Sequence, residues 1–388
     1  MSRIWKITWV SGLFLGLGLP MKADVRPKGE ATPVTVDEVG NLIVKVRLSA
    51  KKPGVPDRDF RFIFDTGATM CVIDPSVPLD FVWEEPEKNK GVTSTVNDGV
   101  GKAIATRITC LKHLDFAGMA REDLTAYRMD LKNTMLGRLQ DEPVDGILGM
   151  NFLQGTRFVL DVSAGEIRWW QDTQGHRVPL AINSSGHPTL TVKVAGTDVP
   201  CTLDTGGNGG FQMPGDPGSS IPSEPFFYGG VSGELKQGNT VKMDCLESGG
   251  KAWMKVSLDL VKPGEGGAVI GREVLCAAPM GLDFIDYWVT FTLDAQGNLP
   301  YRKAPRRPPL IWERRPAGNR LMVWRVNPIS RWAKGGAKEG DEVLAIGSLK
   351  GQALTLHSAT ALSNLNAAQT WLVLRQGKDL ALNIPAEE

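Results

Sequence analysis

The chain has 388 residues, of which 42% are hydrophobic and 22% charged, as in a soluble globular protein of roughly two to three domains. A formal net charge of +1 gives no electrostatic basis for binding nucleic acid or an anionic membrane. Gly (44) and Pro (25) are abundant and long helical periodicities are few, so the sequence favours a turn-rich β protein.

Residues 1–23 have the pattern of a secretory signal peptide. Arg3 and Lys6 form a basic start, and an uncharged, mostly apolar stretch follows until Pro20. We therefore expect the body to be exported, either periplasmic or secreted. The alternative is a short N-terminal anchor, and a membrane is expected as a partner only if this segment is not cleaved.

The first half of the body begins with the alternating segment 42–48, which predicts a strand. A second apolar run then ends in Asp65-Thr66-Gly67. Much later comes the aliphatic element Ile147-Leu148-Gly149, followed by a strand that contains Leu160-Asp161. Asp and Gly are common in turns, so this run predicts a strand that ends in a turn.

The second half repeats this order. Residues 190–194 alternate, the next apolar run ends in Asp204-Thr205-Gly206, and Val269-Ile270-Gly271 precedes Leu282-Asp283. A recurring order of elements is the mark of an internal repeat. We therefore predict two copies of one lobe, at residues 32–172 and 176–299.

A basic, proline-rich segment at 300–318 separates these lobes from the tail. Residues 300–316 hold five Pro and six Lys or Arg against one Glu. This composition is typical of a stiff, solvated linker. A ligand for a Pro-recognition module or an anionic surface is the alternative.

The tail, residues 319–386, has predicted strands at 321–326, 371–375 and 380–384, the last two joined by a hairpin turn at 376–379. With Lys338-Glu339-Gly340-Asp341 after small residues, it resembles a PDZ domain of the bacterial protease-associated kind. The resemblance implies a small α/β domain. The candidate carboxylate-binding loop, Pro316–Leu321, departs from the usual Gly-Leu-Gly-like pattern. A peptide or protein ligand and a structural docking role therefore both stay open.

Residues 32–299 resemble the pepsin-like and retropepsin-like aspartic peptidases, through the two Asp-Thr-Gly motifs and the two aliphatic-Gly elements. The resemblance implies an all-β bilobal fold of two pseudo-symmetric lobes. It implies an endopeptidase with a peptide or protein substrate and with no metal or cofactor. The implied catalytic residues are Asp65 and Asp204, supported by Thr66, Gly67, Thr205 and Gly206.

The residues after each motif depart from pepsins, which carry a Ser or Thr hydroxyl there. Here they are Ala68 and Gly207, and the loss of a donor to the ionised form raises the expected pKa of the pair. The glycine-rich segment 206–210 favours a second hypothesis, a degenerate pseudoprotease that binds peptides or acts as a scaffold. Structural turn aspartates, and a scaffold whose tail carries the function, are the further alternatives.

In this family a β-hairpin flap closes over the substrate. The candidates are Asn97–Gly101 in the first lobe and Tyr228–Gly233 in the second, each of which is also consistent with an ordinary hairpin turn. Five cysteines allow two disulfides without specifying their partners, or buried thiols. The four histidines have no metal-ligand spacing.

Overall fold

The computed structural model describes residues 31–386, except for 38, 51–52, 85–92, 99–100, 172, 216–221, 234, 303–309, 316–319, 327–329, 364 and 366. The predicted signal peptide (1–23), most of the predicted linker and most of the candidate carboxylate-binding loop lie outside the described residues. Within the described part, no helix has the length and apolarity needed to span a membrane.

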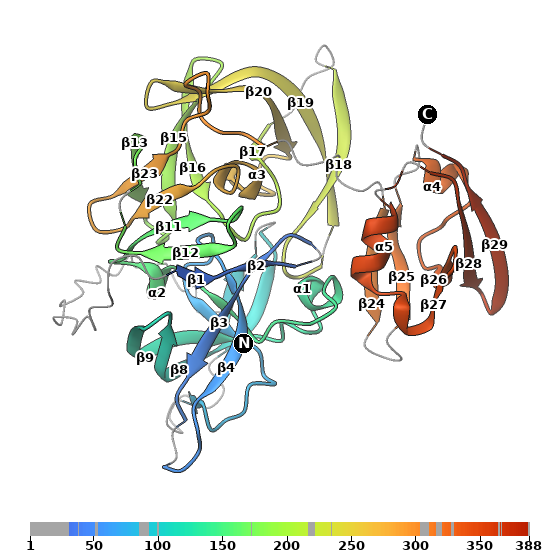
Figure 1. The fold of residues 1–388 in the computed structure, drawn as a ribbon, viewed down its shortest axis with the longest axis horizontal. Helices are drawn as coiled ribbons and strands as arrows, with labels where there is room; N and C mark the ends of the chain where they lie inside the picture. Colours follow the sequence, from blue (N-terminus) through green and yellow to red (C-terminus); the bar gives the residue numbers. More distant parts are fainter. Residues whose placement is uncertain are drawn as a thin grey trace, which may run out of the picture.

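The first lobe is built around a closed barrel of six strands (Figure 1). The ring runs β3, β4, β10, β5, β9, β8 and returns to β3, where Arg47 pairs with Asp115. Alternate apolar side chains of β3 and β4 point into the barrel and are fully buried, as the period of two requires. The elements of this lobe are β2 (Thr35–Val36), β3 (Leu42–Leu48), β4 (Arg58–Phe64), β5 (Cys71–Ile73), β6 (Val82–Glu84), β7 (Thr93–Asn97), β8 (Ala103–Phe116), β9 (Met119–Arg128), α1 (Met135–Arg138), β10 (Gly146–Leu148) and α2 (Met150–Leu153).

The second lobe repeats this topology. Its ring runs β15, β16, β21, β17, β20, β19 and closes where Lys193 pairs with Glu247. In each ring the strand of the aliphatic-Gly element lies parallel to the strand that ends at the Asp. The elements are β14 (Ala181–Ile182), β15 (Pro188–Val194), β16 (Thr197–Leu203), β17 (Phe211–Pro214), β18 (Ser223–Gly229), β19 (Leu235–Ser248), β20 (Lys251–Val261), β21 (Val269–Ile270) and α3 (Arg272–Leu275).

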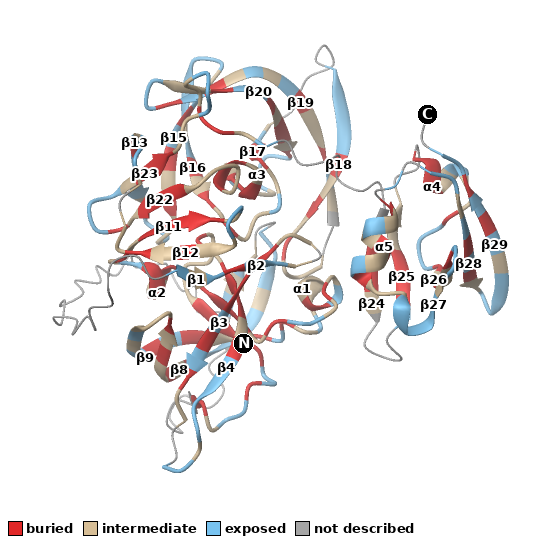
Figure 2. Ribbon diagram, viewed as in Figure 1, coloured by how far each residue is buried: buried red, intermediate tan, exposed pale blue. Residues whose placement is uncertain are grey.

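A six-stranded sheet joins the two lobes. Its order is β1 (Ala31–Pro33), β12 (Glu166–Trp169), β11 (Arg157–Asp161), β22 (Met280–Asp283), β23 (Trp288–Phe291) and β13 (His176–Pro179). At its centre, Leu160 of one half pairs with Met280 of the other. One continuous apolar core therefore runs through both lobes, with the buried strands visible in Figure 2. The chain is mostly β and bilobal, as predicted.

Residues 310–386 form a separate unit with its own core, which we call the C-terminal unit (Figure 1). Trp332 stacks on Trp371 at 4.9 Å between ring centroids, and Trp312 lies 5.1 Å from Trp371. Its elements are β24 (Leu310–Arg315), β25 (Arg320–Val326), α4 (Arg331–Lys334), β26 (Glu342–Ile346), β27 (Leu349–Lys350), a 3-10 turn (Gly351–Ala353), α5 (Leu356–Ser363), β28 (Gln369–Arg375) and β29 (Lys378–Ile384).

Two details of this unit bear on the sequence predictions. The hairpin turn is confirmed, because Arg375 pairs with Lys378 and the two residues between them, Gln376 and Gly377, have φ of 51° and 76°. The composition predicts a linker up to residue 318, whereas Leu310–Arg315 form β24 of the sheet. The proline-rich composition of the segment does not indicate a strand. Trp312 of this strand belongs to the core of the C-terminal unit.

Candidate active site

The two Asp-Thr-Gly motifs lie where strands β4 and β16 end. The Asp65 N–H donates to the Leu148 carbonyl at 3.1 Å, and the Asp204 N–H donates to the Ile270 carbonyl at 2.9 Å. Each aliphatic-Gly element thus extends its parallel pairing to the Asp itself. This fixes the point at which each chain leaves the barrel and turns.

Thr66 and Thr205 link the two loops by four hydrogen bonds. The Thr66 N–H donates to Thr205 Oγ1 (3.0 Å), and the Thr205 N–H donates to Thr66 Oγ1 (3.1 Å). Each hydroxyl in turn donates across the lobes, Thr66 to the Leu203 carbonyl (2.7 Å) and Thr205 to the Phe64 carbonyl (3.0 Å). Both threonines are fully buried. The loops are therefore held in register by a symmetric network that is buried from solvent.

We expect Thr66→Val to lower the free energy of unfolding by about 2–4 kcal/mol, because it leaves the Thr205 N–H and the Leu203 carbonyl buried without partners at about 1–3 kcal/mol each. Urea denaturation measures the change. Thr197→Val, at an exposed position of β16, is the matched control and should change it by less than about 0.5 kcal/mol. Equal stability of the two variants would contradict this role of the network.

Each motif glycine lies against the opposite aspartate. A Cβ on Gly67 would lie 2.4 Å from Cγ of Asp204, and a Cβ on Gly206 would lie 2.5 Å from Cγ of Asp65. Asp204 lies close enough to Asp65 for its charge to raise the Asp65 pKa. The motif needs Gly for this close approach and not for an unusual backbone angle, since neither residue has a positive φ.

Backbone N–H groups donate to both aspartates. The Asp65 Oδ1 accepts from the N–H groups of Gly67 (2.7 Å) and Gly206 (3.2 Å). The Asp204 Oδ1 accepts from the Gly207 N–H at 2.8 Å. Burial, followed by the neighbouring charge of Asp204, nevertheless raises the pKa of Asp65 above its ordinary range. The pair therefore tends to keep one proton.

The glycine-rich second loop is held by several backbone bonds. The carbonyl of Gly207 accepts from the Arg272 N–H (3.0 Å), that of Gly209 accepts from the Glu273 N–H (3.1 Å), and that of Gly210 accepts from the Gly271 N–H (2.7 Å). In the first lobe, the carbonyls of Ala68 and Thr69 accept from 150–151 in the same way. The glycine content suggests a loose second loop, and these bonds anchor it like the first.

Two polar residues beside the pair were not identified from the sequence. Arg272 is buried behind the second loop, where its Nη2 donates to the Val39 carbonyl at 3.3 Å and its Nη1 has no partner among the described residues. Burial lowers the pKa of His187, and the nearby charge of Asp204 opposes that shift. The available signal was position: Arg272 directly follows the aliphatic-Gly element, and His187 directly precedes β15.

The two candidate flap turns contact each other. The Ser232 N–H, from the turn after β18, donates to Asp98 Oδ2 at 3.1 Å, and Asp98 belongs to the turn between β7 and β8. A Cβ on Gly230 would lie 2.2 Å from the same carboxylate. Val231 packs against an apolar cluster of the first lobe that includes Leu131 and Ile147. The two lobes are thus bridged at these turns as well as at the dyad.

Other candidate chemistry is not assembled in the described residues. None of the five cysteines, all of which lie in the described part, forms a disulfide. Burial raises the pKa of both Cys71 and Cys201 to about 12, so neither is poised as a nucleophile. No cluster of His, Cys, Asp and Glu suited to a metal ion is found in the part of the chain that the structure describes.

The comparison with known protein families gives a match within the first lobe. Residues 53–152 match the model of the aspartyl protease family. The match runs from the turn before β4 to α2, so it contains the first Asp-Thr-Gly motif and the first aliphatic-Gly element. No curated protein matches the chain.

Proposed function

We propose that this chain is an aspartic endopeptidase whose catalytic residues are Asp65 and Asp204. The proposal depends on one observation above the others: two equivalent loops, one from each barrel, place each aspartate carboxyl against the glycine of the opposite motif, close enough for Asp204 to raise the pKa of Asp65. The family match of residues 53–152 supports a peptidase-type function independently. Thr66, Gly67, Thr205 and Gly206 are proposed to position the pair.

The chemistry follows from the charges of the pair. Two carboxylates in contact do not both ionise, so they share one proton, as the paired aspartates of aspartic proteases do in general. The ionised member removes a proton from a bound water, which attacks the peptide carbonyl. The protonated member donates to the developing oxyanion, and a proton then passes to the leaving nitrogen. The pair titrates as a unit, so acid and base are roles of the dyad as a whole.

We expect the pH optimum to lie near mildly acidic to neutral values, at about pH 5–7. Activity requires one proton on the pair, and a raised pKa of Asp65 retains that proton to higher pH. The descending limb of the pH–rate profile therefore moves upward. The dependence of kcat/KM on pH measures it. A profile that has already fallen to zero by about pH 4 would refute the expectation.

The second candidate function is a pseudoprotease that binds peptides without cleaving them. The Asp98–Ser232 contact favours it, because it joins the two turns that would have to separate for a substrate to enter. The C-terminal unit is proposed as a PDZ-like domain that docks a substrate, a partner or the body itself. Export to the periplasm or the medium, with or without an N-terminal anchor, is proposed from residues 1–23 alone.

Incubation of the full-length chain with a diverse peptide library between about pH 3 and 8 separates the two candidates. Mass spectrometry then identifies new internal termini. An endopeptidase produces them. A folded chain that retains peptides on a column and leaves all of them intact at every pH would instead establish the pseudoprotease.

A further inference from the structure

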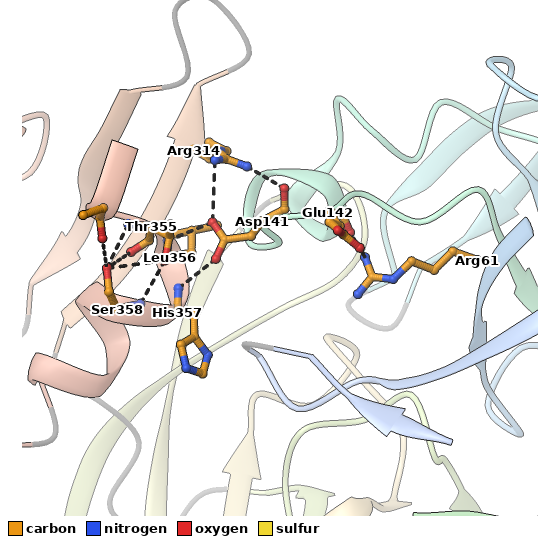
Figure 3. Close-up of polar contacts among 9 residues, drawn as sticks. Arg61, Asp141, Glu142, Arg314, Thr355, Leu356, His357 and Ser358 are labelled. Carbon is orange, nitrogen blue, oxygen red and sulfur yellow. Dashed lines mark hydrogen bonds and ion pairs between the residues drawn. The ribbon is translucent and has the colours of Figure 1, made fainter. Parts of the chain in front are cut away.

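The C-terminal unit contacts the first lobe through a loop that carries no proposed catalytic residue (Figure 3). Asp141, just after α1, is the centre of this contact. Its Oδ1 accepts from the Leu356 N–H and its Oδ2 accepts from the His357 N–H, each at 2.9 Å. These are the first two residues of helix α5, so a carboxylate of the body caps a helix of the tail.

The helix depends on this outside carboxylate. The first turn of α5 contains no acidic residue. Its own cap, Thr355, serves only the Ser358 N–H through Oγ1 (3.1 Å), while Ser358 Oγ accepts from the Thr355 N–H (2.8 Å). The N–H groups of Leu356 and His357 have no partner within the helix itself. A negative charge is favoured at this end of a helix. Asp141 satisfies both and is mostly buried, at 17% side-chain exposure.

Two ion pairs of opposite polarity complete the contact. Arg314 of β24 donates to the Asp141 carbonyl and approaches its carboxylate at 3.7 Å. Arg138, the last residue of α1, lies 3.6 Å from the carboxylate of Glu313, which is 7% exposed. Each side thus offers one anion and one cation. This complementarity fixes how the tail sits on the lobe.

Helix α1 connects this contact to the turn at 230–233. At its C-terminal end, Arg138 pairs with the tail. At its N-terminal end, the Met135 N–H donates to the Val231 carbonyl of the second lobe at 3.2 Å. The next residue, Ser232, donates to Asp98. A single short helix therefore lies between the C-terminal unit and the turn at 230–233.

We propose that the C-terminal unit is a clamp, which holds α1 against the turn at 230–233, and that Asp141 is its releasable latch. The surface formed by the start of α5 and Arg314 is a carboxylate-binding surface, and its occupant is the chain's own first lobe. The unit presents this surface to another carboxylate only after it leaves the lobe. That the turn covers a substrate cleft rests on the proposed function; the latch itself does not.

The test compares Asp141→Ala with Glu142→Ala in the full-length chain. Glu142 belongs to the same loop, its side chain is 81% exposed, and its carboxylate lies 3.8 Å from Arg61 of the same lobe (Figure 3). Residue-resolved hydrogen exchange follows the amides of Met135 and Ser232, and X-ray scattering follows the radius of gyration. Neither readout requires peptide cleavage, so the latch can fail or succeed independently of the dyad.

For Asp141→Ala we expect a larger radius of gyration and exchange at Met135 and Ser232 at least about tenfold faster, since hydrogen bonds to a charged group are lost. Arg314→Gln, which changes the tail and leaves the loop intact, should move both readouts in the same direction. Glu142→Ala should resemble the wild type. Unchanged protection of Met135 and Ser232 in Asp141→Ala, or equal effects in Glu142→Ala, would overturn the clamp.

Discussion

Asp65→Asn and Asp204→Asn are each expected to lower kcat/KM for peptide cleavage at least about 1,000-fold, because residues that act as one catalytic unit lose nearly all of their effect together. The Asn side chain has a similar shape and can form hydrogen bonds. It can neither hold the shared proton nor remove a proton from water. Either substitution alone should therefore abolish the reaction. Cleavage rates measured at the optimum pH of the wild type provide the test.

Asp59→Asn and Asp198→Asn are the matched controls, because they lie on the same strands, β4 and β16, with exposed side chains. Both should retain activity close to that of the wild type. The dyad variants should also be folded. A raised pKa means that the native pair holds a proton which the unfolded chain loses above about pH 4, so the pair costs stability as the pH rises toward the folded pKa. Asn has no such cost. Activity that survives either dyad substitution would eliminate the two-carboxylate mechanism.

Gly67→Ala and Gly206→Ala are expected to reduce kcat/KM by about 100-fold or more, since a misplacement of about 1 Å at reacting groups has an effect of that size. The added methyl group would lie 2.4 Å from Asp204 Cγ in the first case and 2.5 Å from Asp65 Cγ in the second. The opposite carboxylate must move in each case. A substitution in one lobe therefore displaces the catalytic carboxylate of the other lobe.

Gly267→Ala is the control for these variants, because a Cβ there meets no atom within 4 Å and the residue has no positive φ. It should leave kcat/KM unchanged within about twofold. The pH–rate profile gives a second readout, since separating the carboxyl groups weakens their mutual effect on the pKa. Wild-type kinetics in Gly206→Ala would show that the glycine is not required at the pair.

Much of the fold could be predicted because the sequence repeats itself. The apolar run before Asp65 recurs before Asp204, and alternating residues at 42–48 coincide with β3. Such local patterns specify strands and turns, as Gln376-Gly377 does for the last hairpin. The order of elements in each half was therefore sufficient to predict two equivalent lobes.

What the sequence did not predict depends on contacts between distant segments. Asp141 reads as an ordinary loop residue until α5, more than 200 residues away, is placed beside it. Arg272 occupies a position that is Met150 in the other lobe, so the repeat gave no reason to expect a charge there. The glycines at 206–210 suggest mobility, whereas the N–H groups that hold their carbonyls come from residues 271–273, which are remote in the sequence. Amino-acid composition and local patterns do not predict these contacts between remote segments.

The central claim is that Asp65 and Asp204 hold the attacking water between them. It is tested most directly by comparing a statine-type peptide, whose hydroxyl mimics that water, with the same peptide lacking the hydroxyl. We expect the hydroxyl to lower the inhibition constant at least about 100-fold, because transition-state mimics exceed ground-state ligands by such factors. Equal inhibition by the two peptides would contradict a catalytic dyad at this site.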